Sequence, residues 1–127
     1  MYWKDIFVNF QVVSPILGFD SIKEVTFFTV DDFFSTLQSE GISFTLINPA
    51  LLRSYDIKIP LFHKNLLKIE EGDDVRVYCT VIVHSDIAKS AINFAAPMIL
   101  NHSKNLLAQI ALDDPTLGMS ESISTYM

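Results

Sequence analysis

Residues 74–84 show the clearest alternation of side-chain character in the chain. One face is apolar and the other is mixed: the first carries Val75, Val77, Cys79, Val81 and Val83, the second Arg76, Tyr78, Thr80, Ile82 and His84. Because successive side chains of a β-strand point to opposite sides of a sheet, the pattern predicts a central strand. Its apolar face is expected to lie in the core and its mixed face to be partly covered.

Strand signals recur along the rest of the chain, giving about eight strands separated by turns. The other expected strands are 6–13, 24–30, 33–38, 42–48, 55–59, 90–101 and 105–112. Segment 33–40 also fits a short helix capped by Asp31 or Asp32, but Gly41 and the strand candidate after it favour a hairpin. Pro97 predicts a bulge or an edge. This spacing is typical of a small antiparallel β-barrel-like or sandwich domain.

Residues 61–70 have the best helical spacing, and they predict the one short helix, near residues 61–69. Its apolar set is Leu61, Phe62, Leu66, Leu67 and Ile69. Pro60 suits the first helical turn and Gly72 suits the stop. We expect a single domain over residues 1–114. Residues 115–127 are expected to form a C-terminal tail, laid on the surface or frayed.

Composition excludes several classes of function. The chain has 127 residues, and its formal charge of -6 disfavours direct binding to nucleic acid. Its single cysteine cannot form an internal disulfide, and the absence of an apolar run of about 18 residues predicts no membrane span. We therefore expect a cytoplasmic protein. The mean hydropathy of +0.32 predicts either a dense aromatic core or an apolar surface that binds a protein.

No pattern in the sequence predicts catalysis, a cofactor or a metal site. His63, His84, His102 and Cys79 do not have chelating intervals, and no serine has the flanking glycines of a nucleophile elbow. The adjacent aspartates at 31–32, 73–74 and 113–114 are typical of solvated strand boundaries. A hydrolase that brings two distant carboxylates together in a cleft is a rival hypothesis.

The acidic run Glu70, Glu71, Asp73 and Asp74 is more informative. It is either a solvated turn after the helix or a negative patch that docks a basic partner. Carboxylates at the C-terminal end of a helix oppose the helix dipole. That local cost favours a further use for the acidic run.

Five short blocks of sequence resemble the FliW family of flagellar assembly factors, in order and in spacing, from about residue 7 to residue 114. They are SPILGF (14–19), ISFTLINP (42–49), NFAAPMILN (93–101), AQI (108–110) and DD (113–114). The resemblance implies a non-enzymatic β-barrel-like regulator in the cytoplasm. Such a regulator binds new flagellin and, when free, binds and antagonises the translational repressor CsrA, the carbon storage regulator.

The resemblance also suggests partner-binding residues. Asn48, Pro49, Asn93 and Pro97 lie in the matching blocks, where they either shape the backbone or contact a partner. The acidic run is the preferred docking site for CsrA. The free protein is expected to be a monomer without nucleic-acid or membrane partners. The alternative function is a small ligand-binding β-barrel with no flagellar role.

Overall fold

The computed structural model describes residues 7–126, which form a small β-barrel with one short α-helix. The elements are β1 (Val8–Ser14), β2 (Glu24–Thr29), β3 (Phe34–Ser39), β4 (Ile42–Ile47), α1 (Leu61–Leu66), β5 (Val75–Ile82), β6 (Ala91–Asn101), β7 (Leu106–Gln109) and β8 (Glu121–Ser122). Short 3₁₀ turns cover Pro49–Leu51, Ile87–Lys89 and Ile123–Tyr126. The expected mainly β fold class is confirmed.

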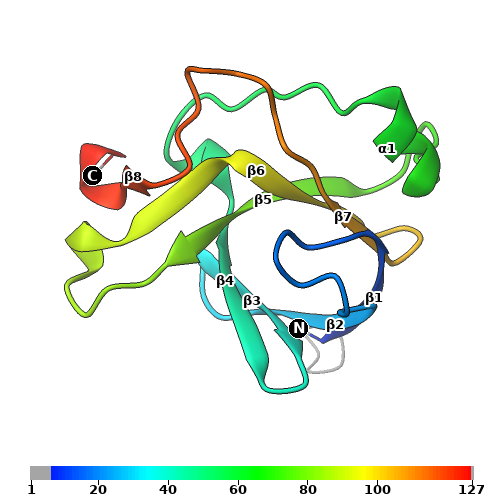
Figure 1. Ribbon diagram of the computed structural model, residues 1–127, viewed down its shortest axis with the longest axis horizontal. Helices are drawn as coiled ribbons and strands as arrows, with labels where there is room; N and C mark the ends of the chain where they lie inside the picture. The colour runs from blue at the N-terminus through cyan, green and yellow to red at the C-terminus, as the bar shows by residue number, and fades with distance from the viewer. Residues whose placement is uncertain (1–6, 127) are drawn as a thin grey trace.

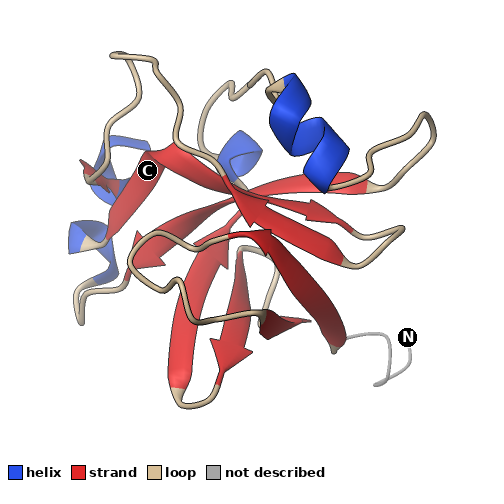
Figure 2. Cartoon of the chain, turned by 45° about the vertical axis from the view of Figure 1, so that its right-hand side comes forward, coloured by secondary structure: helices blue, strands red, loops and turns tan. Residues whose placement is uncertain are grey.

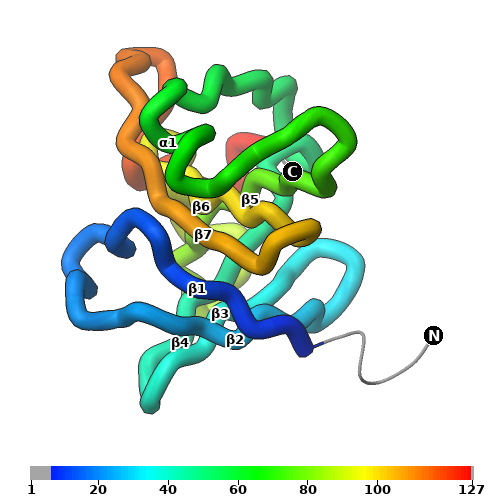
Figure 3. Tube along the Cα trace, turned by 90° about the vertical axis from the view of Figure 1, so that its right-hand side faces the viewer, coloured from blue at the N-terminus to red at the C-terminus, as the bar shows by residue number. Residues whose placement is uncertain are grey.

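The strands close on themselves. Their order is β5-β4-β3-β2-β1-β7-β6-β8, and β5 also pairs with β6, so the first seven strands form a ring (Figure 1). All pairs are antiparallel except β1 with β7. Closure leaves few free strand edges, which are the usual sites of unwanted pairing. Helix α1 lies outside the ring (Figures 2 and 3).

Side chains fill the interior of the barrel. Phe10, Phe27, Leu37, Met98 and Leu100 are buried in one cluster there. The segment between β1 and β2 adds the apolar side chains of Ile16, Phe19 and Ile22 to this cluster. The barrel is therefore a packed core, as in other small barrels, and its interior is not the cavity that a small ligand-binding barrel would need.

Strand β5 presents its apolar face to the outside of the ring. Tyr78, from the face predicted to be mixed, packs inside against Phe27, with ring centroids 5.3 Å apart. Val75 and Val77 are covered by the segment before α1 and by the residues that follow the helix, and Cys79 and Val81 are covered by the C-terminal residues. The prediction of a covered apolar face is confirmed from Val75 to Val81, although chain segments outside the barrel cover it, and Val83 beyond the strand is exposed. Burial raises the pKa of the Cys79 thiol to about 12, which makes it a poor nucleophile.

Turn chemistry is confirmed at two of the predicted positions. Glu40 and Gly41 take positive φ angles of 37° and 84° between β3 and β4, as a tight hairpin requires. Segment 33–38 is thus strand rather than helix. At Pro97, the β5–β6 ladder passes from Tyr78↔Met98 to Thr80↔Asn93, which is the expected bulge.

Two local predictions need correction. Residues 55–59 pair with no strand, because the ring closes without them. The eighth strand is instead β8, which pairs with the edge of β6. The helix ends at Leu66 and not near Gly72. The Ile69 N–H donates to the Lys64 carbonyl and Lys68 has a φ of 53°, which is a Schellman ending.

The apolar residues predicted for the helix do not share one buried face. Leu61 is 72% exposed and Phe62 is also exposed, whereas Leu67 is fully buried. Leu67 and Ile69 lie beyond the helical residues and pack on the outer face of β5 and β6. The helix is too short for its own spacing to decide which side chains are covered.

The C-terminal residues pack against the outer side of the barrel. Ile123 is 5% exposed and joins Phe94, Ile92 and Cys79 in one cluster, and Leu117 and Tyr126 pack at its border. The Phe94 N–H donates to the Gly118 carbonyl. The division into a domain of residues 1–114 and a tail of residues 115–127 stays a prediction, which truncation or substitution can test.

Candidate functional site

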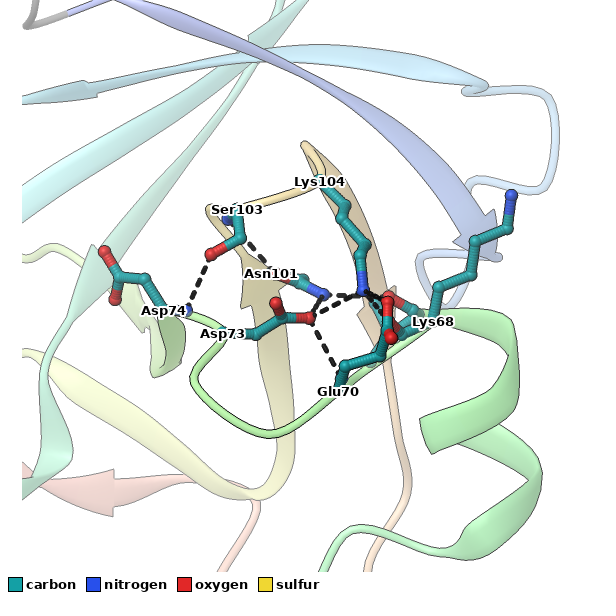
Figure 4. A network of polar contacts seen from close by, with 8 residues as sticks. Lys68, Glu70, Asp73, Asp74, Asn101, Ser103 and Lys104 are labelled. Carbon is teal, nitrogen blue, oxygen red and sulfur yellow. Dashed lines mark hydrogen bonds and ion pairs between the residues drawn. The ribbon is translucent and has the colours of Figure 1, made fainter.

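The acidic run lies in the turn between α1 and β5, beside the turn that joins β6 to β7 (Figure 4). Asp73 is its inward member, with 13% of the side chain exposed. One of its carboxylate oxygens accepts hydrogen bonds from the Glu70 N–H at 3.0 Å, from Asn101 Nδ2 at 3.0 Å and from Lys104 Nζ at 2.9 Å. These donors, the Glu70 amide first, lower the pKa of Asp73 to about 2. Asp73 is therefore tied into the fold.

The other three carboxylates of the acidic run face solvent. Glu70 forms an ion pair with Lys104, and its side chain is 76% exposed. The Asp74 carboxylate lies 2.9 Å from the Arg76 guanidinium, which lowers its pKa. Glu71 is also exposed. Two bases therefore offset part of the negative charge, and the field of the acidic run is weaker than its sequence suggests.

Asn101 holds this turn together, and it was not among the predicted site residues. It is fully buried. Its Nδ2 donates to the Leu67 carbonyl and to Asp73, and its Oδ1 accepts from the Ser103 N–H. Ser103 in turn accepts the Asp74 N–H through Oγ. The sequence does carry a signal for this role, because Asn101 is an amide at the end of a long apolar strand. A polar group buried there needs hydrogen-bond partners.

His102 lies next to this network, with its ring turned into the barrel. The ring centroid is 5.0 Å from that of Phe10 and 5.4 Å from that of Phe27. Nε2 is buried without a hydrogen-bond partner. Burial is the main cause that lowers the pKa of His102, followed by the charge of Arg76, while Asp74 opposes the shift. The folded protein therefore favours the neutral ring.

Stability is expected to fall on mild acidification because of His102. Its pKa is lower folded than unfolded, so stability is complete above the unfolded value of about 6.5 and is lost as the pH falls below it. One proton changes the unfolding free energy by at most about 1.4 kcal/mol per pH unit. Urea unfolding at pH 7.5 and 5.5 should show a larger loss for the unmodified protein than for His102→Phe. Equal losses would contradict this assignment.

A groove opens where β4 and β5 separate. These strands pair only over Thr45–Ile47 and Cys79–Val81, and the β3–β4 and β5–β6 hairpins then point in different directions (Figure 1). The groove has a volume of about 660 Å³. Its buried lining residues include Ile16, Met98 and Gln109, Phe19 and Phe44 are partly buried, and its rim carries the exposed Leu17, Ile82 and Met119. No lining residue is charged.

Comparison with known sequences decides the family. The sequence model of the FliW protein family matches residues 4–123. The chain belongs to the FliW family. The flagellar assembly factor FliW of Sulfurimonas denitrificans is 41% identical over 94% of this chain and 98% of its own length. FliW 2 of Wolinella succinogenes is 38% identical over 94% of this chain and 92% of its own length.

The fold agrees with this membership. A crystal structure of the flagellar assembly factor FliW superposes with a TM-score of 0.82. The superposition covers 97% of this chain and 88% of the chain in that crystal structure, and the two sequences are 24% identical. The similarity extends through the closed barrel and its outer segments. The resemblance seen in the sequence blocks is therefore confirmed by both sequence and fold.

The four residues predicted from the FliW-like blocks shape the backbone. Asn48 accepts the Ala50 N–H at the start of a 3₁₀ turn whose first residue, Pro49, is buried. Asn93 accepts the Ala95 N–H at the bulge of β6, and Pro97 is buried beside it. Asn93 also lines the groove. These residues lie along the later part of β5, away from the acidic run before its start. Partner contact by any of them stays a prediction.

Carboxylates from distant segments of this FliW-family chain also meet in one hollow. Asp56, Asp113 and Asp114 line a hollow of about 460 Å³ with Arg53 and Lys58. A hydrolytic pair needs one carboxyl group with a raised pKa. Hydrogen bonds from Thr116 lower the pKa of Asp114 instead.

Among residues 7–126, no helix has the length and apolar character to cross a membrane.

Proposed function

We propose that this chain is a cytoplasmic, non-enzymatic flagellar assembly factor that couples flagellin synthesis to export. It binds newly made flagellin, and when free it binds and antagonises CsrA. The observation that carries the proposal is the match to relatives named flagellar assembly factor FliW along nearly the whole chain. The two partners come from what the family resemblance implies. The free protein is proposed to be a monomer.

The structure offers two surfaces of different chemistry, which supports a protein with two partners. The uncharged apolar groove suits the capture of an apolar segment. The exposed carboxylates of Glu70, Glu71 and Asp74 suit a basic protein. We propose that CsrA docks on the acidic run.

Binding to purified partners tests the proposed function. The full chain, flagellin monomers and CsrA are mixed in pairs and analysed by pull-down and size-exclusion chromatography. We expect a complex with each partner and a monomeric elution of the chain alone. Ovalbumin, which is also acidic, serves as the control for non-specific capture of CsrA. Failure to bind either flagellin or CsrA would overturn the proposal.

Removing the exposed charges of the acidic run should slow the association with CsrA. Glu70→Gln, Glu71→Gln and Asp74→Asn are combined, and Asp73 is left intact because it holds the turn. We expect the association rate to fall about threefold to tenfold at low salt, with a flatter salt dependence, because exposed charges steer encounter. Flagellin binding should change less.

A matched control separates the site from the total charge. Glu24→Gln, Asp31→Asn and Asp32→Asn remove the same number of exposed charges from the β1–β2–β3 side of the barrel. Stopped-flow association rates are compared at low and high salt. Equal rates for both triple variants would show that the acidic run is only a solvated turn.

A further inference from the structure

The separation of β4 from β5 leaves two strand edges facing one groove. Residues 42–44 of β4 pair with β3 alone, and Ile82 of β5 pairs with β6 alone. Unpaired edges of this kind are unusual in a closed barrel, because the neighbouring strand normally forms hydrogen bonds with the backbone groups on that side. An extended peptide laid between them could add main-chain hydrogen bonds to either edge, which is recognition by strand addition.

The side chains in the groove select what kind of strand could enter. Phe19, Phe44 and Met98 line the groove with apolar side chains, and Ile82 on the rim is 75% exposed. The lining carries no charge, in a chain whose formal charge is -6. A charged side chain buried here would lose its hydration without gaining a counter-ion. The complementary occupant is an uncharged segment with apolar residues at alternate positions.

We propose that this groove binds an extended, uncharged, apolar segment of flagellin by adding it as a strand between β4 and β5. The inference rests on the proposed function, which supplies flagellin as the partner. Apolar side chains at alternate positions of the segment enter the groove, and those between them face solvent. The CsrA-docking surface proposed above lies elsewhere, before the start of β5. Flagellin and CsrA therefore do not compete for the same residues.

Two substitutions with the same chemistry test the groove. Ile82→Glu places a carboxylate on its rim, and Leu61→Glu places one on the equally exposed surface of α1. Both positions are open to solvent, so both variants should keep the thermal unfolding midpoint of the unmodified protein. We expect Ile82→Glu to weaken flagellin binding at least tenfold and Leu61→Glu to change it less than twofold, as measured by calorimetry.

Hydrogen exchange of the unmodified protein gives a second readout that needs no variant. Binding of flagellin should slow amide exchange in residues 42–44 and 82–83, whereas exchange in residues 61–62 should stay unchanged. Equal affinity of the two variants, or no new protection at either edge, would overturn the groove as the binding site. A groove-dependent dimer of the chain alone would also overturn it, because a second copy would then be the occupant. Failure of the unmodified chain to bind flagellin would instead overturn the proposed function and the groove with it.

Discussion

Ile123→Ala is expected to lower the free energy of unfolding by about 2–4 kcal/mol, because the truncation leaves a cavity in a packed cluster. Ile123 is 5% exposed and packs with Phe94, Ile92 and Cys79 on the outer side of the barrel. If residues 115–127 were only a frayed tail, the substitution would have almost no effect. Chemical denaturation followed by circular dichroism measures the difference.

Ile82→Ala is the matched control, since it removes the same atoms from an exposed position on β5. We expect it to change stability by about 0.5 kcal/mol or less. A similar small loss for Ile123→Ala would show that the C-terminal segment contributes little to the fold. A large loss would mean that the stable unit extends beyond residue 114.

Asn101→Ala should destabilise the protein by about 2–4 kcal/mol, because it leaves buried polar groups without partners. The Leu67 carbonyl and the Ser103 N–H each lose a hydrogen bond to this amide, and Asp73 loses one of its three donors. Asn65→Ala is the control, on the exposed surface of α1, and should stay within about 0.5 kcal/mol. Urea denaturation measures both.

The same variant should loosen the acidic run. Hydrogen exchange of the amides in residues 68–74 should become faster in Asn101→Ala and remain unchanged in Asn65→Ala. CsrA binding then reports whether the geometry of the run or only its charge matters. Unchanged stability and exchange would contradict the role assigned to Asn101.

Local sequence features determined most of the strands and turns. Alternation at 42–48 and 74–84, the Glu40-Gly41 turn and the proline at position 97 each depend on interactions between near neighbours. Those interactions are the same in any context that supplies a sheet. The match of motif blocks likewise led to the correct family, because spacing along the chain is preserved when a fold is preserved.

Tertiary structure decided how these pieces are used. Residues 55–59 alternate but pair with no strand of the ring, and the valine face of β5 lies outside the ring because the ring closes with Tyr78 inside. The acidic run is tied down by Asn101 and Lys104, which follow Asp73 by 28 and 31 residues. The groove exists because β4 and β5 separate after Thr45 and Val81. Pairing, burial and charge compensation between distant residues depend on the closed barrel, and local periodicity contains no information about which strand will lie beside which.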